Sequence, residues 1–103
     1  MTTNALAWVN FNGTTSPGTI RAQYNVSSVT KNGTGDYTLN FTTAMSDTNY
    51  VLTGTAGTGS TQNASVNPNF NVASPTTTAM RFQVTTTANV IDLVYVHCAI
   101  FGN

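Results

Sequence analysis

Short segments in which apolar residues recur at every second position are the feature that most constrains the fold of this chain. They occur within residues 5–11, 37–41 and 80–85 and show the two-residue period of a half-buried β-strand. The sequence Asn-Gly-Thr-Gly at residues 32–35 is a strong hairpin-turn signal, because Asn and Gly tolerate positive φ. No segment shows the period of a helix, so the chain is predicted to be all-β.

The pattern predicts about seven strands in one domain, residues 1–103. The expected strands cover residues 5–11, 20–24 with a bend into 26–31, 37–42, 50–56, 63–70, 80–85 and 91–101. Pro68 interrupts the segment 63–70, which favours an edge position because proline cannot donate to a sheet. We expect a small antiparallel β-sandwich.

Charge is almost absent from this chain. Three basic and three acidic residues give a formal net charge of zero. Binding to nucleic acid or to an anionic membrane surface needs a basic patch, so we expect neither partner. No apolar run approaches the ~20 residues that cross a bilayer, and no basic stretch precedes an apolar one at the N-terminus. Membrane insertion and a signal peptide are therefore not expected.

Residues suited to catalysis or metal binding are few. The chain has one histidine (His97), one cysteine (Cys98) and no glutamate. Asp92 lies five positions before His97, so on one strand the two side chains would face opposite sides. We expect no enzymatic activity, no cofactor and no metal site. Three copies of His97 around a three-fold axis would be a metal site, but a structural histidine is the favoured interpretation.

The C-terminal segment 91–101 is apolar on both of its faces. One face would carry Leu93, Tyr95, His97, Ala99 and Phe101, and the other Val94, Val96, Cys98 and Ile100. A sandwich covers only one face of each sheet, and a long exposed apolar strip favours association. We therefore predict that Val94, Val96, Cys98 and Ile100 form an interface between copies of the chain. The alternative is a loop folded over the outer face.

Aromatic rings and uncharged polar side chains are also the components of a carbohydrate site. Rings stack on sugar faces, and amides hydrogen-bond to hydroxyls. Trp8, Tyr24 and Tyr50 are possible platforms, although core packing is favoured for Trp8. The candidate receptor-binding residues lie in two polar segments and are Gly59, Ser60, Thr61, Gln62, Asn63, Asn67, Asn69 and Asn71.

Four segments carry a resemblance to a known family. They are Trp8-Val9-Asn10-Phe11-Asn12-Gly13-Thr14, residues 26–45 (VSSVTKNGTGDYTLNFTTAM), Asn49-Tyr50, and Val96-His97-Cys98-Ala99-Ile100-Phe101-Gly102-Asn103. These segments are similar to the C-terminal tip domain of bacteriophage tail-fibre and tail-spike proteins. The resemblance is dense up to about residue 51, looser over residues 53–87 and firm again at the end.

The resemblance implies a homotrimeric β-sandwich that attaches a virion to a bacterial surface glycan or protein without catalysis. It also implies a protein made in the host cytoplasm and located in the phage tail. The looser segment holds the polar loops, where a variable receptor surface is expected. Two alternatives stay open: a purely structural trimerisation or assembly module, and a lectin-like carbohydrate-binding domain unrelated to virions.

Overall fold

The computed structural model describes residues 5–58, 63–87 and 89–102, and within them the chain is all-β, as predicted. The strands are β1 (Ala7–Asn12), β2 (Thr19–Tyr24), β3 (Val26–Gly33), β4 (Asp36–Phe41), β5 (Val51–Gly57), β6 (Asn63–Pro68), β7 (Ala79–Thr85) and β8 (Tyr95–Phe101). Nowhere in these residues is there a helix long and apolar enough to span a membrane.

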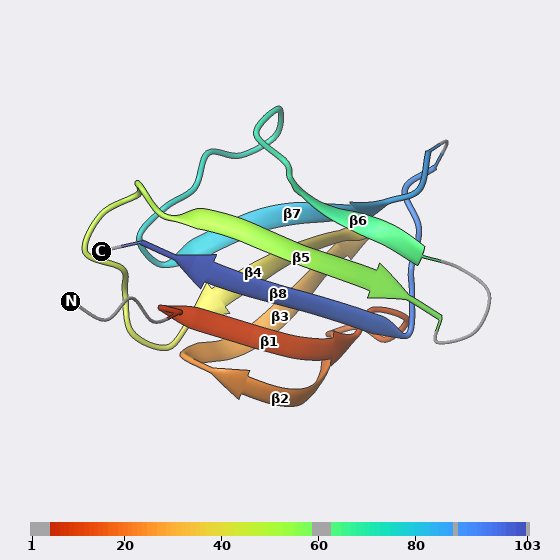
Figure 1. The fold of residues 1–103 in the computed structure, drawn as a ribbon, viewed down its shortest axis with the longest axis horizontal. Coiled ribbons are helices and arrows are strands. Elements are labelled where there is room, and N and C mark those ends of the chain that lie inside the picture. Colours follow the sequence, from red (N-terminus) through yellow and green to blue (C-terminus); the bar gives the residue numbers. More distant parts are fainter. Residues whose placement is uncertain (1–4, 59–62, 88, 103) are drawn as a thin grey trace.

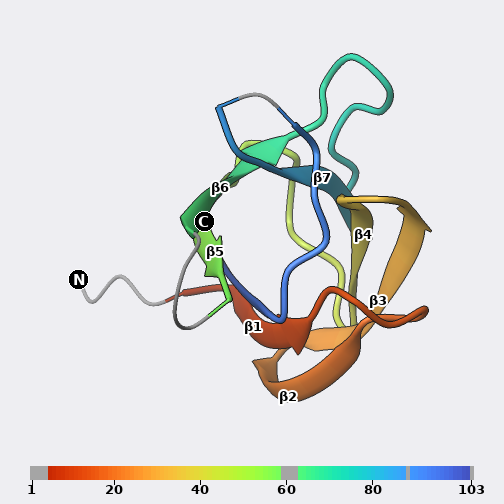
Figure 2. The ribbon, with the colours of Figure 1, turned by 90° about the vertical axis from the view of Figure 1, so that its right-hand side faces the viewer.

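The strands form one antiparallel sheet, in the order β2-β1-β8-β5-β6-β7-β4-β3. The sheet curls into a nearly closed barrel in place of the predicted sandwich, with β5, β8 and β1 side by side in front of β3 and β4 (Figures 1 and 2). The edge strands β2 and β3 approach each other where Gly18 N donates to the Val29 carbonyl oxygen at 3.0 Å. Alternation in the sequence predicts which residues face inward, but it does not distinguish two sheets from one rolled sheet.

The barrel interior is filled by every second residue of the strands, as predicted for residues 7–11, 37–41 and 80–84. The largest fully buried side chains are Tyr37, Phe11, Phe82, Leu39, Ile100, Val9, Val26, Val29, Val84 and Val96. The rings of Phe11, Tyr37 and Phe82 contact one another, with centroid separations of 5.2, 6.1 and 5.6 Å. Offset and edge-on contacts at these distances are the arrangements that aromatic pairs prefer.

Asn25 carries the chain from one edge strand of the sheet to the other. It is the single residue between β2 and β3 and has φ 57°, a left-handed conformation that asparagine tolerates. Its amide nitrogen donates to the carbonyl oxygens of Leu6 at 3.2 Å and Thr43 at 3.1 Å. The bend predicted between residues 24 and 26 is therefore confirmed.

The prediction that residues 63–70 form an edge strand is wrong, because β6 lies between β5 and β7. Its pairing changes along its length: residues 63–65 pair with β5, and residues 65–68 pair with β7. Pro68 therefore lies where β6 has a partner on one side alone, which satisfies the constraint that proline places on a strand.

The connection between β7 and β8 crosses one end of the barrel (Figure 2) and is held there by Asp92. Asp92 Oδ2 accepts from Lys31 Nζ at 2.7 Å, and Oδ1 accepts from Gly35 N at 2.7 Å. The Tyr37 hydroxyl lies 2.9 Å from Asp92 Oδ1 and 2.6 Å from the Gly13 carbonyl oxygen. This polar network joins β3, β4, the β1–β2 loop and the β7–β8 connection.

Gly35 allows the connection to pack directly on the β3–β4 hairpin. Its φ is +62°, and a Cβ placed there would lie 2.6 Å from Ile91 N and would also collide with Val90. A glycine is required at this position because it combines a left-handed conformation with a close backbone approach. The hairpin turn predicted at residues 32–35 is confirmed, and Gly35 has this second role.

β8 begins at Tyr95, later than the strand predicted over residues 91–101. Leu93 and Val96 are both buried although they are three positions apart, so the two-residue period does not run through Val94. Val96, Cys98 and Ile100 consequently point into the barrel, where their own protomer covers them. This corrects their assignment to an interface between copies. Of the four residues assigned to it, Val94 is the exposed one.

Asp92→Asn is expected to destabilise the barrel by about 1.5–3 kcal/mol, because the neutral amide loses the charged hydrogen bond from Lys31. Burial alone would raise the pKa of Asp92, but hydrogen bonds from Lys31, Gly35 N and Tyr37 lower it below the ordinary value of 3.8. The stabilisation is thus complete above pH 3.8 and is lost as the pH falls through the lower folded pKa.

Thermal unfolding followed by circular dichroism at several pH values checks this prediction. The native Tm should fall as the pH drops below about 4, and the Tm of Asp92→Asn should fall less. Asp47→Asn, on the β4–β5 loop, controls for the loss of one negative charge. Equal pH dependence in the native protein and Asp92→Asn would contradict the role of this carboxylate.

Candidate functional site

The outer face of β1, β8 and β5 carries exposed aromatic and uncharged polar side chains. Trp8 is 40% exposed and Tyr95 is 42% exposed. The cross-strand row between the rows of Trp8 and Tyr95 carries the exposed side chains of His97 on β8 and Thr55 on β5. This face therefore presents rings and hydrogen-bonding groups to the solvent.

The outer face of β3, β4 and β7 is different, because its polar side chains bond to one another. Asn40 Nδ2 donates to Ser28 Oγ and Thr30 Oγ1, both at 3.0 Å. Arg81 Nε and Nη2 donate to the two carboxylate oxygens of Asp36 at 3.0 and 2.7 Å. Its polar groups already have partners, so this face offers fewer hydrogen-bonding positions to a ligand than the face of β1, β8 and β5.

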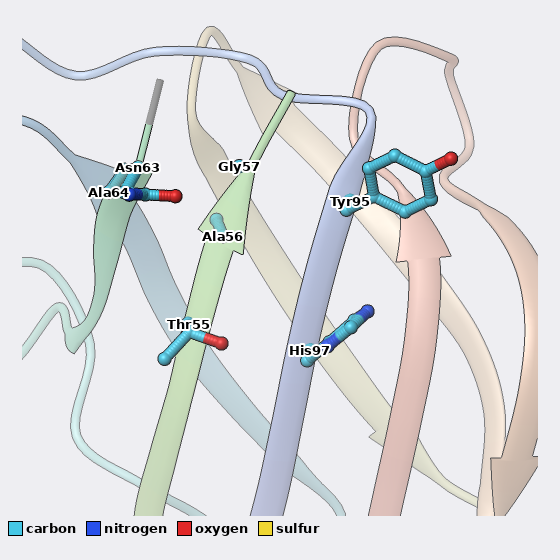
Figure 3. A pocket seen from close by; sticks show the side chains of 7 residues that line it. All are labelled: Thr55, Ala56, Gly57, Asn63, Ala64, Tyr95 and His97. Carbon is cyan, nitrogen blue, oxygen red and sulfur yellow. The ribbon is translucent and has the colours of Figure 1, made fainter. Parts of the chain in front are cut away.

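A shallow hollow of about 380 Å³ lies over the ends of β5, β6 and β8 (Figure 3). Gly57 pairs with Tyr95 on one side and with Asn63 on the other, so a residue without a side chain lies between two residues that have side chains. Figure 3 shows Tyr95 and His97 projecting from β8, and Asn63 from β6 on the other side of β5. The missing side chain of Gly57 thus creates the hollow.

A second hollow of about 330 Å³ adjoins the first on the side of Trp8. Its lining includes Trp8, Asn10, Thr53, Gly54, Thr55, His97 and Ala99. Ala99 pairs with both Trp8 and Thr53, so a small side chain forms the floor between them. His97 and Thr55 line both hollows. We call the two hollows together the His97 groove.

Arg21 of β2 fixes the Tyr95 end of the groove. Its Nη2 donates to the Val94 carbonyl oxygen at 2.7 Å, and its Nη1 donates to Asn10 Oδ1 at 3.2 Å. The guanidinium carbon also lies 4.6 Å from the centroid of the Tyr95 ring, a cation–π distance. These contacts orient Tyr95 and engage the amide oxygen of Asn10 as an acceptor.

Among the predicted receptor-binding residues that the structure describes, Asn63 and Asn67 are brought together in one hollow. Gly59, Ser60, Thr61 and Gln62 lie outside the described residues. Asn63 is exposed and lines both the His97 groove and this polar hollow, where Asn67 Nδ2 donates to Thr85 Oγ1 at 2.7 Å. Asn69 is buried, which corrects its assignment to a receptor surface, and Asn71 is exposed on the β6–β7 loop.

Two of the three proposed aromatic platforms are accessible. Trp8 and Tyr24 are exposed, and the expectation that Trp8 packs in the core is wrong because its neighbours Ala7 and Val9 point inward. Tyr50 is buried, so it is not a platform; its hydroxyl donates to the Thr76 carbonyl oxygen at 2.8 Å. Burial raises the pKa of Tyr50 to about 12.

Tyr95 and His97 were not among the sequence-predicted binding residues. Alternation correctly placed them on one face of a C-terminal strand, but both faces were apolar, and the prediction assigned the opposite face to the contact between copies. Residue type is a signal that was available: Tyr95 and His97 have polar ring atoms, whereas Val96 and Ile100 have none. The face with polar-tipped rings is the one exposed in the structure.

The chemistry of the groove is that of uncharged hydrogen-bonding groups beside aromatic rings. Amide, hydroxyl and imidazole groups each offer both donors and acceptors. In the part of the chain that the structure describes, no three His, Cys, Asp or Glu side chains are grouped so as to hold a metal ion. Cys98 lies beneath the groove, and burial raises the pKa of its thiol. The arrangement provides for binding by stacking and hydrogen bonds.

In comparisons with known proteins, no family model, no curated protein and no solved structure matches this chain. Its function is therefore inferred from the groove and from the sequence.

Gly54→Ala is expected to destabilise the protein by about 1–3 kcal/mol, because the added Cβ would collide with the His97 carbonyl oxygen on β8. Urea unfolding measures the change. Gly33→Ala is the matched control: nothing lies within 4 Å of its added Cβ, and we expect a change within about 0.5 kcal/mol. Equal losses in the two variants would contradict the close approach of β5 and β8 beneath the groove.

Proposed function

We propose that this chain is the non-catalytic tip domain of a bacteriophage tail fibre, which assembles as a homotrimer and attaches the virion to a bacterial surface glycan. The observation that carries the proposal is the His97 groove, with Trp8 and Tyr95 exposed beside uncharged polar groups. The resemblance of the segments 8–14, 26–45 and 96–103 to tail-fibre tips supports the setting in a virion.

A glycan matches the groove better than a charged ligand does. A sugar ring has an apolar face that stacks on an aromatic ring and hydroxyl edges that both donate and accept hydrogen bonds. The chain has zero formal net charge, so it lacks the basic surface that holds a polyanion. These observations favour attachment through a neutral polysaccharide.

Exposed apolar side chains on the same sheet support self-association. Val51 and Phe101 lie directly opposite each other on β5 and β8, and they are 59% and 36% exposed. An apolar pair left in water favours a contact with another protein surface. This pair also favours the second candidate function, a purely structural trimerisation module.

Light scattering on the purified protein tests the assembly. We expect a particle of three times the chain mass of 10.9 kDa. Phe101→Ser should shift the mass toward that of a single chain, because it removes one half of the exposed apolar pair. Phe70→Ser, a change of an exposed aromatic on the β6–β7 loop, should leave the mass unchanged. A native mass near 10.9 kDa would contradict the trimer.

An array of bacterial surface polysaccharides, probed with the labelled protein, tests attachment. Binding to neutral glycans is expected, and it should persist at about 0.5 M salt because screening acts on exposed charges. Anionic glycans of similar length serve as the comparison. An array on which no glycan is bound would remove the attachment function and favour the structural module.

A further inference from the structure

We propose that the His97 groove is an oligosaccharide site that binds at least two neutral sugar rings, one on Trp8 and one on Tyr95, with His97 hydrogen-bonding between them. This inference rests on the proposed function. It goes further by naming the residues that make the contact, the charge of the glycan and the least length of glycan that the site requires.

The spacing of the two aromatic residues sets the length. Trp8 pairs with Ala99, and Ala99 lies four residues after Tyr95 on the same strand. At ~3.3 Å per residue, the two platforms are about 13 Å apart along the sheet. This span exceeds one sugar ring, so a ligand that contacts both platforms is an oligosaccharide.

The polar side chains between the platforms lie in one cross-strand row. Asn10 and Thr55 flank His97 on either side, since both pair with it across the sheet. Thr53 lies beside Ala99 in the neighbouring row and lines the same hollow. Each of these groups offers donors, acceptors or both, as sugar hydroxyls do. Hydrogen bonds along the length of the ligand would therefore fix its direction.

Charge selects a neutral ligand. Arg21 borders the groove, but its guanidinium group is already engaged by Asn10, by the Val94 carbonyl oxygen and by the Tyr95 ring. The hollows themselves are lined by uncharged side chains and by His97. An anionic sugar would therefore meet no cation available to pair with it, and it would lose hydration on binding.

A second copy of the chain is the competing occupant of this face. Protein interfaces are most apolar at their buried core. Here the face is hollow at Gly57, at one end of β5, and polar at Thr53 and Thr55 in its middle, and the exposed apolar pair Val51 and Phe101 lies at the other end of β5 and β8. The hollows therefore fit a small polar ligand better than a flat protein surface.

Intrinsic fluorescence tests the site directly, because Trp8 is the single tryptophan of the chain. The probes are hexasaccharides of glucose, galactose, mannose and rhamnose, their disaccharides and monosaccharides, and heparin hexasaccharide as the anionic comparator. We expect at least one neutral hexasaccharide to shift the Trp8 emission saturably, with about ten-fold or higher affinity than its monosaccharide. Heparin hexasaccharide should cause no shift.

Variants separate the two platforms. Tyr95→Ala keeps Trp8 as the reporter; it should lower hexasaccharide affinity about ten-fold and leave the affinity of the monosaccharide at Trp8 unchanged. Trp8→Ala lacks the fluorescent reporter, so its binding is measured by calorimetry. It should bind neither the hexasaccharide nor the shorter sugar. Thr55→Lys places a long charged side chain where the hollows meet, on an exposed strand position, and should block the hexasaccharide. Circular dichroism melting curves check that each variant is folded.

Phe70→Ala and Asn71→Ala, both on the β6–β7 loop, are the controls and should bind as the native protein does. Hexasaccharide binding that is lost in the loop variants but kept in Trp8→Ala, Tyr95→Ala and Thr55→Lys would overturn this inference and leave glycan attachment standing. Failure of every neutral glycan, in solution and on the array, would overturn both. If Trp8→Ala has a lower particle mass but an unchanged affinity for sugars, the face would be assigned to contact with a second copy, and the inference would be overturned.

Discussion

The carboxylate of Asp92 is the contact on which the rest of the structure depends, because it determines where β8 enters the sheet. Asp92 binds Lys31 and the backbone of Gly35, so the connection after β7 is held across the end of the barrel. Next to it, the Leu93 carbonyl oxygen accepts from Gly13 N at 2.9 Å. The chain then joins β1 and β5 with Val96 inward and His97 outward. A slip of one residue would exchange the two faces of β8, so the groove exists because this register is fixed.

The sequence predicts the parts of this fold that are governed by local pattern. The strand containing Tyr37 has a polar outer face, so its inner face was unambiguous. The turn at residues 32–35 and the bend at Asn25 follow from residues that tolerate positive φ. β8 differs because both of its faces are apolar, and its register is set by a contact between Asp92 and Lys31, which are 61 positions apart. Alternation contains no information on such a contact, so it did not place Tyr95 and His97 on the outside; their polar ring atoms were the one local signal that indicated this position.

The same dependence on distant contacts explains why the candidate site lies on the sheet and not in the polar loops, where it was predicted. Polar loops are the usual place for a receptor surface, and the sequence therefore predicts binding residues in the segments around Gln62 and Asn69. Asn69 instead is buried beside β7, where its backbone nitrogen donates to the Arg81 carbonyl oxygen at 3.0 Å. The hollows of the sheet face lie over the small residues Gly57 and Ala99. A small residue leaves a hollow only where the neighbouring strands place larger side chains beside it. Strand order, and not composition, therefore locates the site.

The scarcity of charge links the fold to the proposed mode of binding. Two of the three basic residues, Lys31 and Arg81, form ion pairs with Asp92 and Asp36, and Arg21 is held against Tyr95. In the proposed function, recognition by this surface therefore depends on ring stacking and hydrogen bonds to water-exposed groups, which would give modest affinity in a shallow groove. In the proposed trimer, three linked copies would compensate for this, because each further contact forms at a high effective concentration once the first is made. Trimeric assembly and a weak neutral-glycan groove thus form one proposal, in which the oligomer supplies the strength of attachment and the groove supplies its selectivity.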